Sequence, residues 1–431
     1  MVIENPYITG GMVKDPKMFF GREQELRRIR DRLRKGDCTA VVGLRRMGKS
    51  SLLYQLAHQT EALPDGVVVA YIDLQDAVHH EPLGLLNGAL SALDARLGQR
   101  YHFGPVDTLG VFSVAVKRVA ADGYRPVLCL DEVEELTQRE AFDNDFFEGL
   151  RSLGNQRILA YVTASGSPLD TLIKQSGRTS EFYNLFVNLP LAGLSGDAAR
   201  ALLTEPFRDA GLTPPADEYV DYVLELAGHY PFYLQMAASH LFEAQRTGGP
   251  LNRNALRRAF ANDAVSHLRA LWGTLDAEER SGVKRLAGVS ATVRDWDALR
   301  ADLVRCGLAE TAEGEVGLFS PVFREMVASD RIERKTPRRR RYQGKQENKT
   351  SPEEAYEQDN GTELSHLFAY AIIAFLSTGI AFVIARFLPP EGFWPFFAVL
   401  TVVLGFILVG VNKMTGGQFV DLIDKFMGGG K

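Results

Sequence analysis

The stretch from Gly43 to Ser50 constrains the fold more than any other part of the chain, because it reads Gly-Leu-Arg-Arg-Met-Gly-Lys-Ser. It fits the pattern G-x-x-x-x-G-K-[ST], in which backbone N–H groups wrap phosphate groups. An apolar run at 38–42 precedes it, and a helical pattern begins at Ser51. Phosphates would then lie at a helix N-terminus, where the helix dipole and free N–H groups both favour anions. The sequence therefore predicts a strand, a phosphate-binding loop (residues 43–50) and a helix, in that order.

The residues of this loop have separate expected roles toward a nucleotide and its Mg²⁺. Gly43 and Gly48 allow a tight turn and a close approach of the backbone to the phosphates. Lys49 is expected to reach the β- and γ-phosphates, and the hydroxyl of Ser50 to ligate Mg²⁺. We therefore expect ATP and Mg²⁺ as ligands. The other residues predicted to border the nucleotide here are Arg46, Met47 and Ser51.

A second motif follows the loop by about eighty residues, a separation that favours a shared site over chance. An apolar run at 127–130 ends in Asp131 and Glu132. Asp131 would hold Mg²⁺ directly or through water. Glu132 would orient and polarise the attacking water. A solvated turn is the alternative for an Asp-Glu pair alone, but downstream of a phosphate-binding loop the pair favours hydrolysis.

Two further kinds of catalytic candidate, hydroxyls and arginines, have weaker signals. Ser165 or Thr163, at the end of an apolar run, could hydrogen-bond the γ-phosphate, although a hydroxyl that caps a strand end fits equally well. Charge on a transferring phosphoryl group is often neutralised by an arginine from a neighbouring subunit, and Arg178 could supply it. Arg45 and Arg46 are candidates within the loop itself. A solvated surface arginine is the alternative for each of the three.

Strand-like and helical segments alternate from 36 to about 190, which predicts an α/β fold whose parallel sheet is covered on both faces. Residues 1–190 are thus expected to form the α/β domain and 191–262 a helical lid. Short helices followed by a two-stranded hairpin at 263–330 suggest a winged-helix domain. The strand candidates are Thr39–Val42, Val67–Leu74, Pro126–Asp131, Ile158–Thr163 and Phe186–Leu189.

Four separated motifs, together with the phosphate-binding loop, carry a family resemblance. They are Asn5-Pro6-Tyr7, Phe19-Phe20-Gly21-Arg22-Glu23, Leu130-Asp131-Glu132 and Gly228-His-Tyr-Pro231. Over residues 1–330 the chain resembles the STAND-like ATPases of the AAA+ superfamily, in the prokaryotic clade related to archaeal and origin-recognition-type ATPases.

The resemblance implies roles that the residues alone do not reveal. Gly21 and Arg22 would border the adenine, and Pro231 would lie in the lid. Lid and winged helix would move relative to the sheet as the nucleotide state changes. No arginine occurs at 232–240, where the family's sensor arginine would be sought. This departure favours slow, switch-like hydrolysis over a motor.

The end of the chain lies outside the resemblance. Residues 331–364 read as a flexible charged linker. Two uncharged apolar runs within 365–412 approach the ~20 residues that span a bilayer, which predicts a transmembrane hairpin. A buried helical hairpin in a soluble domain is the alternative. Residues 413–431 contain a short amphipathic helix. Because no signal peptide precedes the ATPase part, we expect a two-pass protein of the inner or cell membrane with that part in the cytoplasm.

The charge of the chain limits the classes of partner that it is expected to bind. The net charge is −5, which argues against a chain that binds nucleic acid over its whole surface. The expected recognition segment of the winged helix, Asp295–Arg305, carries three Asp and two Arg, so DNA is possible but not favoured. Small residues spaced by four in the apolar runs suggest packing within the hairpin or a homo-oligomer.

The leading hypothesis is a membrane-anchored signalling ATPase that responds to an unknown protein or ligand trigger. The alternatives are a membrane-tethered ATPase that acts on DNA and a nucleotide-gated membrane scaffold with little turnover.

Overall fold

The computed structural model describes residues 3–249, 252–312, 314–329 and 332. The chain divides into two compact units, residues 1–336 and 337–431, and the fold given below is that of the first. The predicted linker beyond Ile332, the hairpin at 365–412 and the tail at 413–431 lie outside the described residues. Within the described part, none of the helices combines the length and apolar character needed to cross a bilayer.

A five-stranded parallel sheet forms the centre of the unit, in the order β2-β3-β4-β1-β5. The predicted parallel α/β architecture is therefore confirmed. The strand β4 begins and ends two residues later than expected, because the N–H groups of Ile158 and Leu159 still bond the carbonyl of Leu153 at the end of a helix. The strands are β1 (Cys38–Val42), β2 (Val67–Asp73), β3 (Arg125–Asp131), β4 (Ala160–Ser165) and β5 (Phe186–Pro190).

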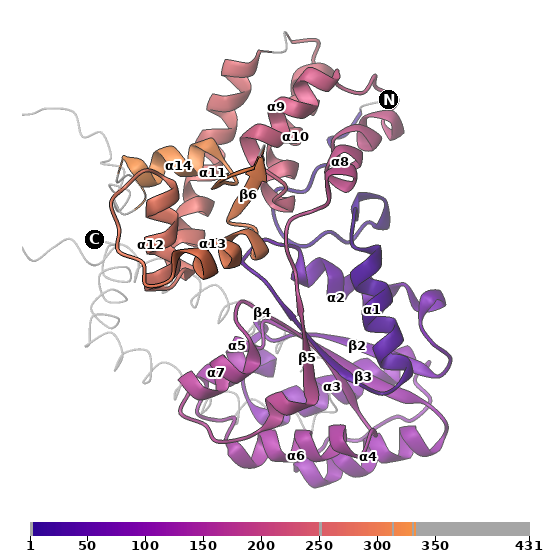
Figure 1. Ribbon diagram of the computed structural model, residues 1–431. Helices are drawn as coiled ribbons and strands as arrows, with labels where there is room; N and C mark the ends of the chain where they lie inside the picture. The colour runs from indigo at the N-terminus through magenta and orange to yellow at the C-terminus, as the bar shows by residue number, and fades with distance from the viewer. Residues whose placement is uncertain (1–2, 250–251, 313, 330–331, 333–431) are drawn as a thin grey trace, which may run out of the picture. The chain divides into compact units, whose positions relative to one another are not determined.

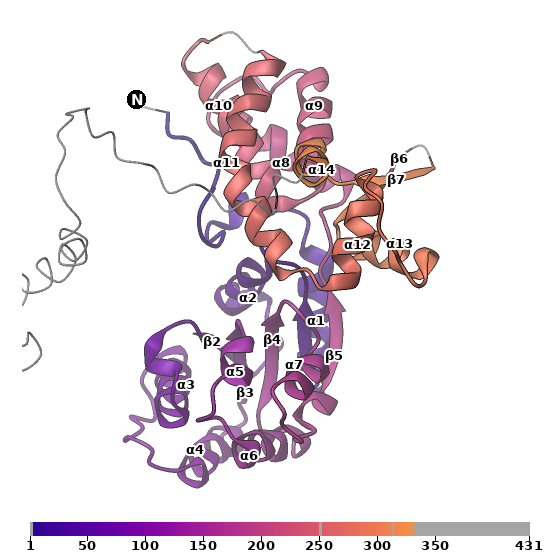
Figure 2. The ribbon, with the colours of Figure 1, turned by 90° about the vertical axis from the view of Figure 1, so that its left-hand side faces the viewer.

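Helices cover the sheet closely enough that every residue of β4 is buried, as expected for a central strand with both faces covered. In both ribbon views the helix that follows the phosphate-binding loop, α2, lies between the sheet and the helices of the next layer (Figures 1 and 2). The helices of this part are α1 (Glu23–Arg34), α2 (Lys49–His58), α3 (Pro82–Arg96), α4 (Leu109–Ala121), α5 (Glu134–Gln138), α6 (Asn144–Asn155) and α7 (Leu169–Gln175).

Four helices form the lid layer, on the side of the sheet opposite α4 and α6 (Figure 1). They are α8 (Gly196–Asp209), α9 (Asp217–Ala227), α10 (Pro231–Arg246) and α11 (Arg253–Thr274). The predicted boundary between 262 and 263 falls inside α11, which does not break there. Its buried residues keep helical spacing across that point, from Phe260 through Ala264 to Leu268, so one continuous face packs against the rest of the lid.

The last described elements agree in part with the predicted helices and hairpin, since α11 extends into this segment and a helix follows the hairpin. Two helices, α12 (Ala277–Leu286) and α13 (Trp296–Arg305), precede an antiparallel hairpin of β6 (Ala309–Ala312) and β7 (Glu315–Leu318). A short helix, α14 (Pro321–Ala328), closes the series. The hairpin after α12 and α13 was expected and α14 was not, and the assignment as a winged helix stays a prediction.

Candidate functional site

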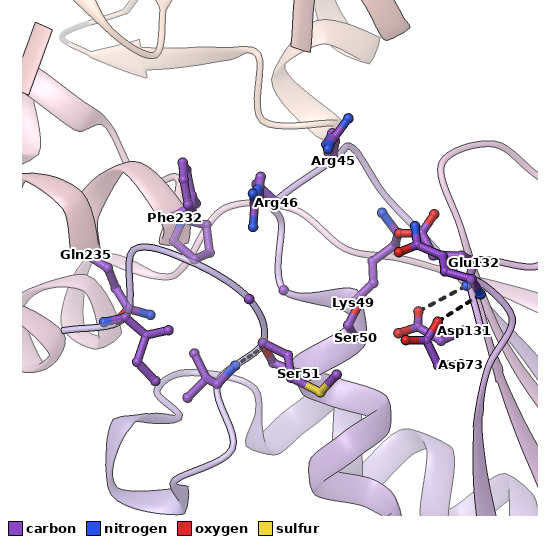
Figure 3. Close-up of a pocket in the computed structure, with 17 residues that line it drawn as sticks. Arg45, Arg46, Lys49, Ser50, Ser51, Asp73, Asp131, Glu132, Phe232 and Gln235 are labelled. Atoms are coloured by element: carbon purple, nitrogen blue, oxygen red, sulfur yellow. Dashed lines mark hydrogen bonds between the residues drawn. The ribbon is translucent and has the colours of Figure 1, made fainter. Parts of the chain in front are cut away.

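A cavity of about 430 Å³ lies where the phosphate-binding loop, the ends of two strands, the lid and the N-terminal segment meet. Figure 3 shows Lys49, Ser50, Asp131 and Glu132 together on one side, with Phe232 of the lid on the other. The loop and α2 contribute Arg45, Arg46, Gly48, Lys49, Ser50 and Ser51. The strand ends contribute Asp73, Gln75, Asp131 and Glu132, and the lid contributes Pro231, Phe232 and Gln235.

The glycines of the loop are required by its backbone. Gly48 caps α2 with φ of 92°, a conformation that costs other residues energy. A Cβ added at Gly43 would lie 2.8 Å from the carbonyl oxygen of Leu191, just after β5. The N–H of Gly43 also donates to the carbonyl of Ser165 at 3.1 Å. The loop is thus held against the ends of β4 and β5.

Lys49 is buried, and its ammonium group turns back on its own loop. Nζ donates to the carbonyl oxygens of Gly43 at 2.8 Å and Leu44 at 3.2 Å. Burial lowers the pKa of Lys49, and the carboxylates of Glu132, Glu134 and Asp131 oppose that shift. A phosphate oxygen would replace these carbonyls with a charged partner, which forms the stronger hydrogen bond.

Asp131 is the buried carboxylate of the site. Its Oδ2 accepts the hydroxyl of Tyr71 at 2.7 Å and its Oδ1 accepts the N–H of Glu132 at 3.1 Å. The hydroxyl of Ser50 also bonds this carboxylate. Burial raises the pKa of Asp131, while Tyr71, Ser50 and Lys49 counter the rise. The structure therefore brings the two predicted metal residues into direct contact.

These groups fit Mg²⁺, which takes oxygen ligands and keeps several waters or phosphate oxygens. A hydroxyl and a carboxylate are the hard donors it prefers, and a buried carboxylate gains most from a nearby cation. Within the described ranges no group of three or more His, Cys, Asp or Glu side chains could hold a metal ion by itself. Phosphate oxygens and water are the usual further ligands of Mg²⁺ at such sites.

Two residues of this cluster were missed by the sequence analysis. Tyr71 holds Asp131, and Asp73 lines the cavity at the end of β2. Asp73 pairs with Asp131 across β2 and β3. The strand order was needed to find them, because only adjacency of β2 and β3 brings an acid at the end of one to the end of the other.

Glu132 lies at the junction of two cavities. It lines the first and also a second one of about 440 Å³, to which Glu134 and Gly166 contribute. Its φ of 56° is left-handed, a rare conformation for a residue with a side chain. Burial raises the pKa of Glu132, and Lys49 counters that rise. Glu134, which the sequence analysis did not single out, accepts the N–H of Gly166.

The lid touches the phosphate-binding loop directly. The hydroxyl of Tyr230 donates to the carbonyl of Arg45, and the guanidinium of Arg46 lies 4.6 Å from the ring centroid of Phe232. Pro231 occupies the first turn of α10, where its missing N–H costs nothing. Nucleotide between loop and lid would therefore meet both at once.

Comparisons with known proteins agree with this geometry. Residues 31–171 match the family model described as AAA domain, and residues 108–291 match the one described as novel STAND NTPase 2. The structure is similar to that of a Walker-type ATPase of Pyrococcus abyssi, with a TM-score of 0.54 and 16% identity over 74% of this chain and 98% of that one. The fold is that of a P-loop NTPase.

Two other proteins are also similar to this chain. The ORC2 protein of Aeropyrum pernix has a TM-score of 0.47 and 14% identity, over 75% of this chain and 99% of that one. An uncharacterized WD repeat-containing protein of Synechocystis is 23% identical over 384 residues, 78% of this chain. The chain spans only 31% of the length of that curated relative.

Ser165, predicted to contact the γ-phosphate, lies beside the phosphate-binding loop, but its hydroxyl is engaged by another group. Its side chain is buried, and its hydroxyl donates to the carbonyl of Ser167 at 2.7 Å. Ser165 does not line either cavity beside Glu132. The alternative that the sequence left open, a hydroxyl that caps a strand end, describes it better. Thr163 is also fully buried, and its hydroxyl has no hydrogen-bond partner.

Arg178 also departs from its predicted role. Its guanidinium donates to the carbonyls of Phe142, Thr137 and Arg139, so all three of its nitrogens are engaged. This arginine fastens the segment between α5 and α6 and does not line the nucleotide cavity. These contacts give Arg178 a structural role in this chain, and a contribution to the site of a neighbouring subunit stays a prediction.

Arg22 and Gly21 lie beside the loop, but the side chain of Arg22 bonds the protein backbone. It is buried, and Nη2 donates to the carbonyls of Met47 at 3.2 Å and Ala192 at 2.6 Å. Gly21 packs so closely on α8 that an added Cβ would lie 2.4 Å from the Cβ of Ala198. Arg22 and Met47 border a small cavity of about 40 Å³ behind the loop, the place that the resemblance implies for adenine.

An N-terminal segment, residues 5–13, crosses from the lid to α2 over the cavity. The side chain of Asn5 bonds Ser239 of α10 at 3.0 Å, and the N–H of Ile8 donates to Gln235 at 2.8 Å. At its other end, the N–H of Val13 donates to the hydroxyl of Ser51 at 2.9 Å. The position of this segment could not be predicted from the sequence.

Stability is expected to depend on pH through His229. Its Nδ1 lies 3.0 Å from Oε2 of Glu310 in β6, and this hydrogen bond raises the pKa of His229 above its usual 6.5. The contribution is full below that usual value and is lost as pH rises through the raised one. His229→Gln should therefore lower the unfolding midpoint at pH about 6 more than at pH about 8.5. Scanning calorimetry at both pH values checks this, and Glu310→Gln should show the same trend.

Proposed function

We propose that this chain is an ATP-binding switch that hydrolyses ATP slowly in the presence of Mg²⁺. The observation that carries the proposal is the convergence of Lys49, Ser50, Asp131 and Glu132 on one cavity that the lid also borders. The AAA and STAND matches over residues 31–291 support a nucleoside triphosphatase of this type.

Different residues of the chain have separate roles in the proposed hydrolysis. The N–H groups at the start of α2 and the ammonium of Lys49 bind phosphate oxygens. Ser50 and Asp131 would hold Mg²⁺, which supplies charge neutralisation between the phosphates. Glu132 orients the attacking water and accepts its proton, and its raised pKa suits a base that must take up a proton.

The switch follows from contacts between lid and loop. Tyr230 and Phe232 hold Arg45 and Arg46 in the present arrangement. A nucleotide shifts such an equilibrium only by binding one arrangement better than the other. Turnover is proposed to be slow because α10 has no arginine before Arg246, which pairs with Glu243 at its far end.

The test uses the full chain purified in detergent. ATP turnover is measured by phosphate release, and nucleotide affinity by competition with a fluorescent ATP analogue. We expect Mg²⁺-dependent turnover, and loss of nucleotide binding in Lys49→Ala. Binding without any turnover would reduce the function to the nucleotide-gated scaffold. Failure of the wild type to bind ATP or ADP would refute the proposal.

We further propose that residues 365–412 anchor the switch in a membrane, with the NTPase part in the cytoplasm, and that clustering of several copies transmits the signal. The support is the sequence: two uncharged apolar runs at 367–385 and 393–411. If the chain stayed in the supernatant after high-speed centrifugation of lysed cells, the anchor would be excluded.

DNA is not proposed as a partner. The two arginines of α13 lie beside its own aspartates, Arg300 at 3.7 Å from Asp297 and Arg305 close to Asp302. These acids oppose phosphate binding on that helix.

A further inference from the structure

Arg45 is an exposed arginine at the edge of the nucleotide cavity (Figure 3). It lines both the 430 Å³ and the 440 Å³ cavities, and it shares them with Lys49, Gln75 and Glu132. A group at this junction faces the space between the lysine that reaches the phosphates and the carboxylate that orients water. That space is where the terminal phosphate of a nucleoside triphosphate would lie.

The backbone of Arg45 is held by contacts with the lid, whereas its side chain is free to contact a ligand. Its carbonyl accepts the hydroxyl of Tyr230, and the next residue, Arg46, packs on Phe232. Within the described part of the chain, the guanidinium of Arg45 forms neither an ion pair nor a hydrogen bond. It is, however, close enough to Lys49 and Glu132 to lower the pKa of both.

The other arginines near the site are occupied. Arg46 lies over the ring of Phe232, and its Nε is buried without a partner. Arg22 and Arg178 donate to backbone carbonyls. The first turns of α10 contain no arginine. Arg45 is therefore the candidate cation that the chain itself can direct at the terminal phosphate.

We propose that Arg45 binds the γ-phosphate from within the same chain and stabilises the charge that develops on it during transfer. This inference rests on the proposed function. It assigns to Arg45 the neutralisation of phosphoryl charge for which Arg178 was also a candidate. A guanidinium offers planar paired N–H donors to phosphate oxygens, which an ammonium cannot match. Because the carbonyl of Arg45 is held by Tyr230, movement of the lid would also move this cation relative to Lys49.

The test compares Arg45→Ala, Arg45→Lys and Arg46→Ala in the full chain. Arg45→Ala is expected to lower kcat by on the order of 10²- to 10³-fold. It should weaken a non-hydrolysable ATP analogue roughly tenfold and leave ADP affinity unchanged, since ADP lacks the group that Arg45 contacts. Arg45→Lys should recover part of kcat. Arg46→Ala should weaken ATP analogue and ADP alike, because its side chain holds the lid.

Two outcomes in Arg45→Ala would overturn the assignment: an unchanged ratio of ATP-analogue to ADP affinity, or full activity. If the wild type binds nucleotide without hydrolysing it, the hydrolytic function fails, and the ratio of ATP-analogue to ADP affinity still decides the role of Arg45. Arg45 is exposed, so its variants should melt at the wild-type temperature. A lowered melting midpoint, together with an equal loss of affinity for the ATP analogue and for ADP, counts against the proposal.

Discussion

Replacing Glu132 by Gln is expected to reduce ATP turnover by about 10²- to 10⁴-fold, the range over which a positioned general base acts, while ATP still binds. Glutamine keeps the shape of the side chain and removes the charge that accepts the proton. Glu132 lines both cavities, whereas phosphate binding depends on the loop and Lys49. Single-turnover phosphate release and nucleotide competition separate the two effects.

Glu135→Gln is the matched control for this variant. Glu135 lies three residues further along and pairs with Arg139 at 2.6 Å, away from both cavities. Its turnover should equal that of the wild type. A fully active Glu132→Gln would mean that another carboxylate serves as the base, and Glu134, which lines the second cavity, would be tested next.

Arg22→Met is expected to destabilise the fold by roughly 3 kcal/mol, since a hydrogen bond to a charged group contributes ~1.5–3 kcal/mol and two carbonyls lose their donor. These are the carbonyls of Met47 and Ala192, which Arg22 joins from a buried position. Glu25, 3.2 Å from Nη1, would also lose its partner. The variant should unfold at lower urea concentration.

The role of Arg22 can be separated from nucleotide recognition. Arg27→Met changes an exposed arginine of the same helix and should leave the urea midpoint unchanged. If Arg22→Met kept wild-type stability but lost ATP affinity, Arg22 would contact the nucleotide itself, as the family resemblance implied. A loss of stability before nucleotide is added supports the structural role.

The sheet could be predicted because its signals are local. An apolar run, a glycine-rich loop and a helical pattern identify β1 and the residues that follow it, and β3 ends at Asp131, with Glu132 next in the chain. The residues gathered around Lys49 were likewise predictable, because motif spacing on a parallel sheet places strand ends at one edge. The exact ends of β4 depended on a helix packed beneath it.

The contacts of Ser165 and Arg178 could not be predicted from the sequence. The side chains of Ser165 and Arg178 have donors suited to the predicted roles, but in the structure these donors bond backbone carbonyls. Every residue has a backbone carbonyl, so neither composition nor spacing identifies which carbonyls will accept a hydrogen bond from a side chain. Tyr71 and Asp73 were missed for a related reason, since their position depends on β2 lying next to β3.

The segment from Asn5 to Val13 has a consequence for synthesis on the ribosome. Asn5 and Ile8 need Ser239 and Gln235 as partners, which are synthesised more than two hundred residues later. The sheet can form earlier, but its nucleotide cleft stays open at this end until α10 has left the exit tunnel. A nascent chain stalled before residue 230 should therefore release bound nucleotide faster than the finished protein.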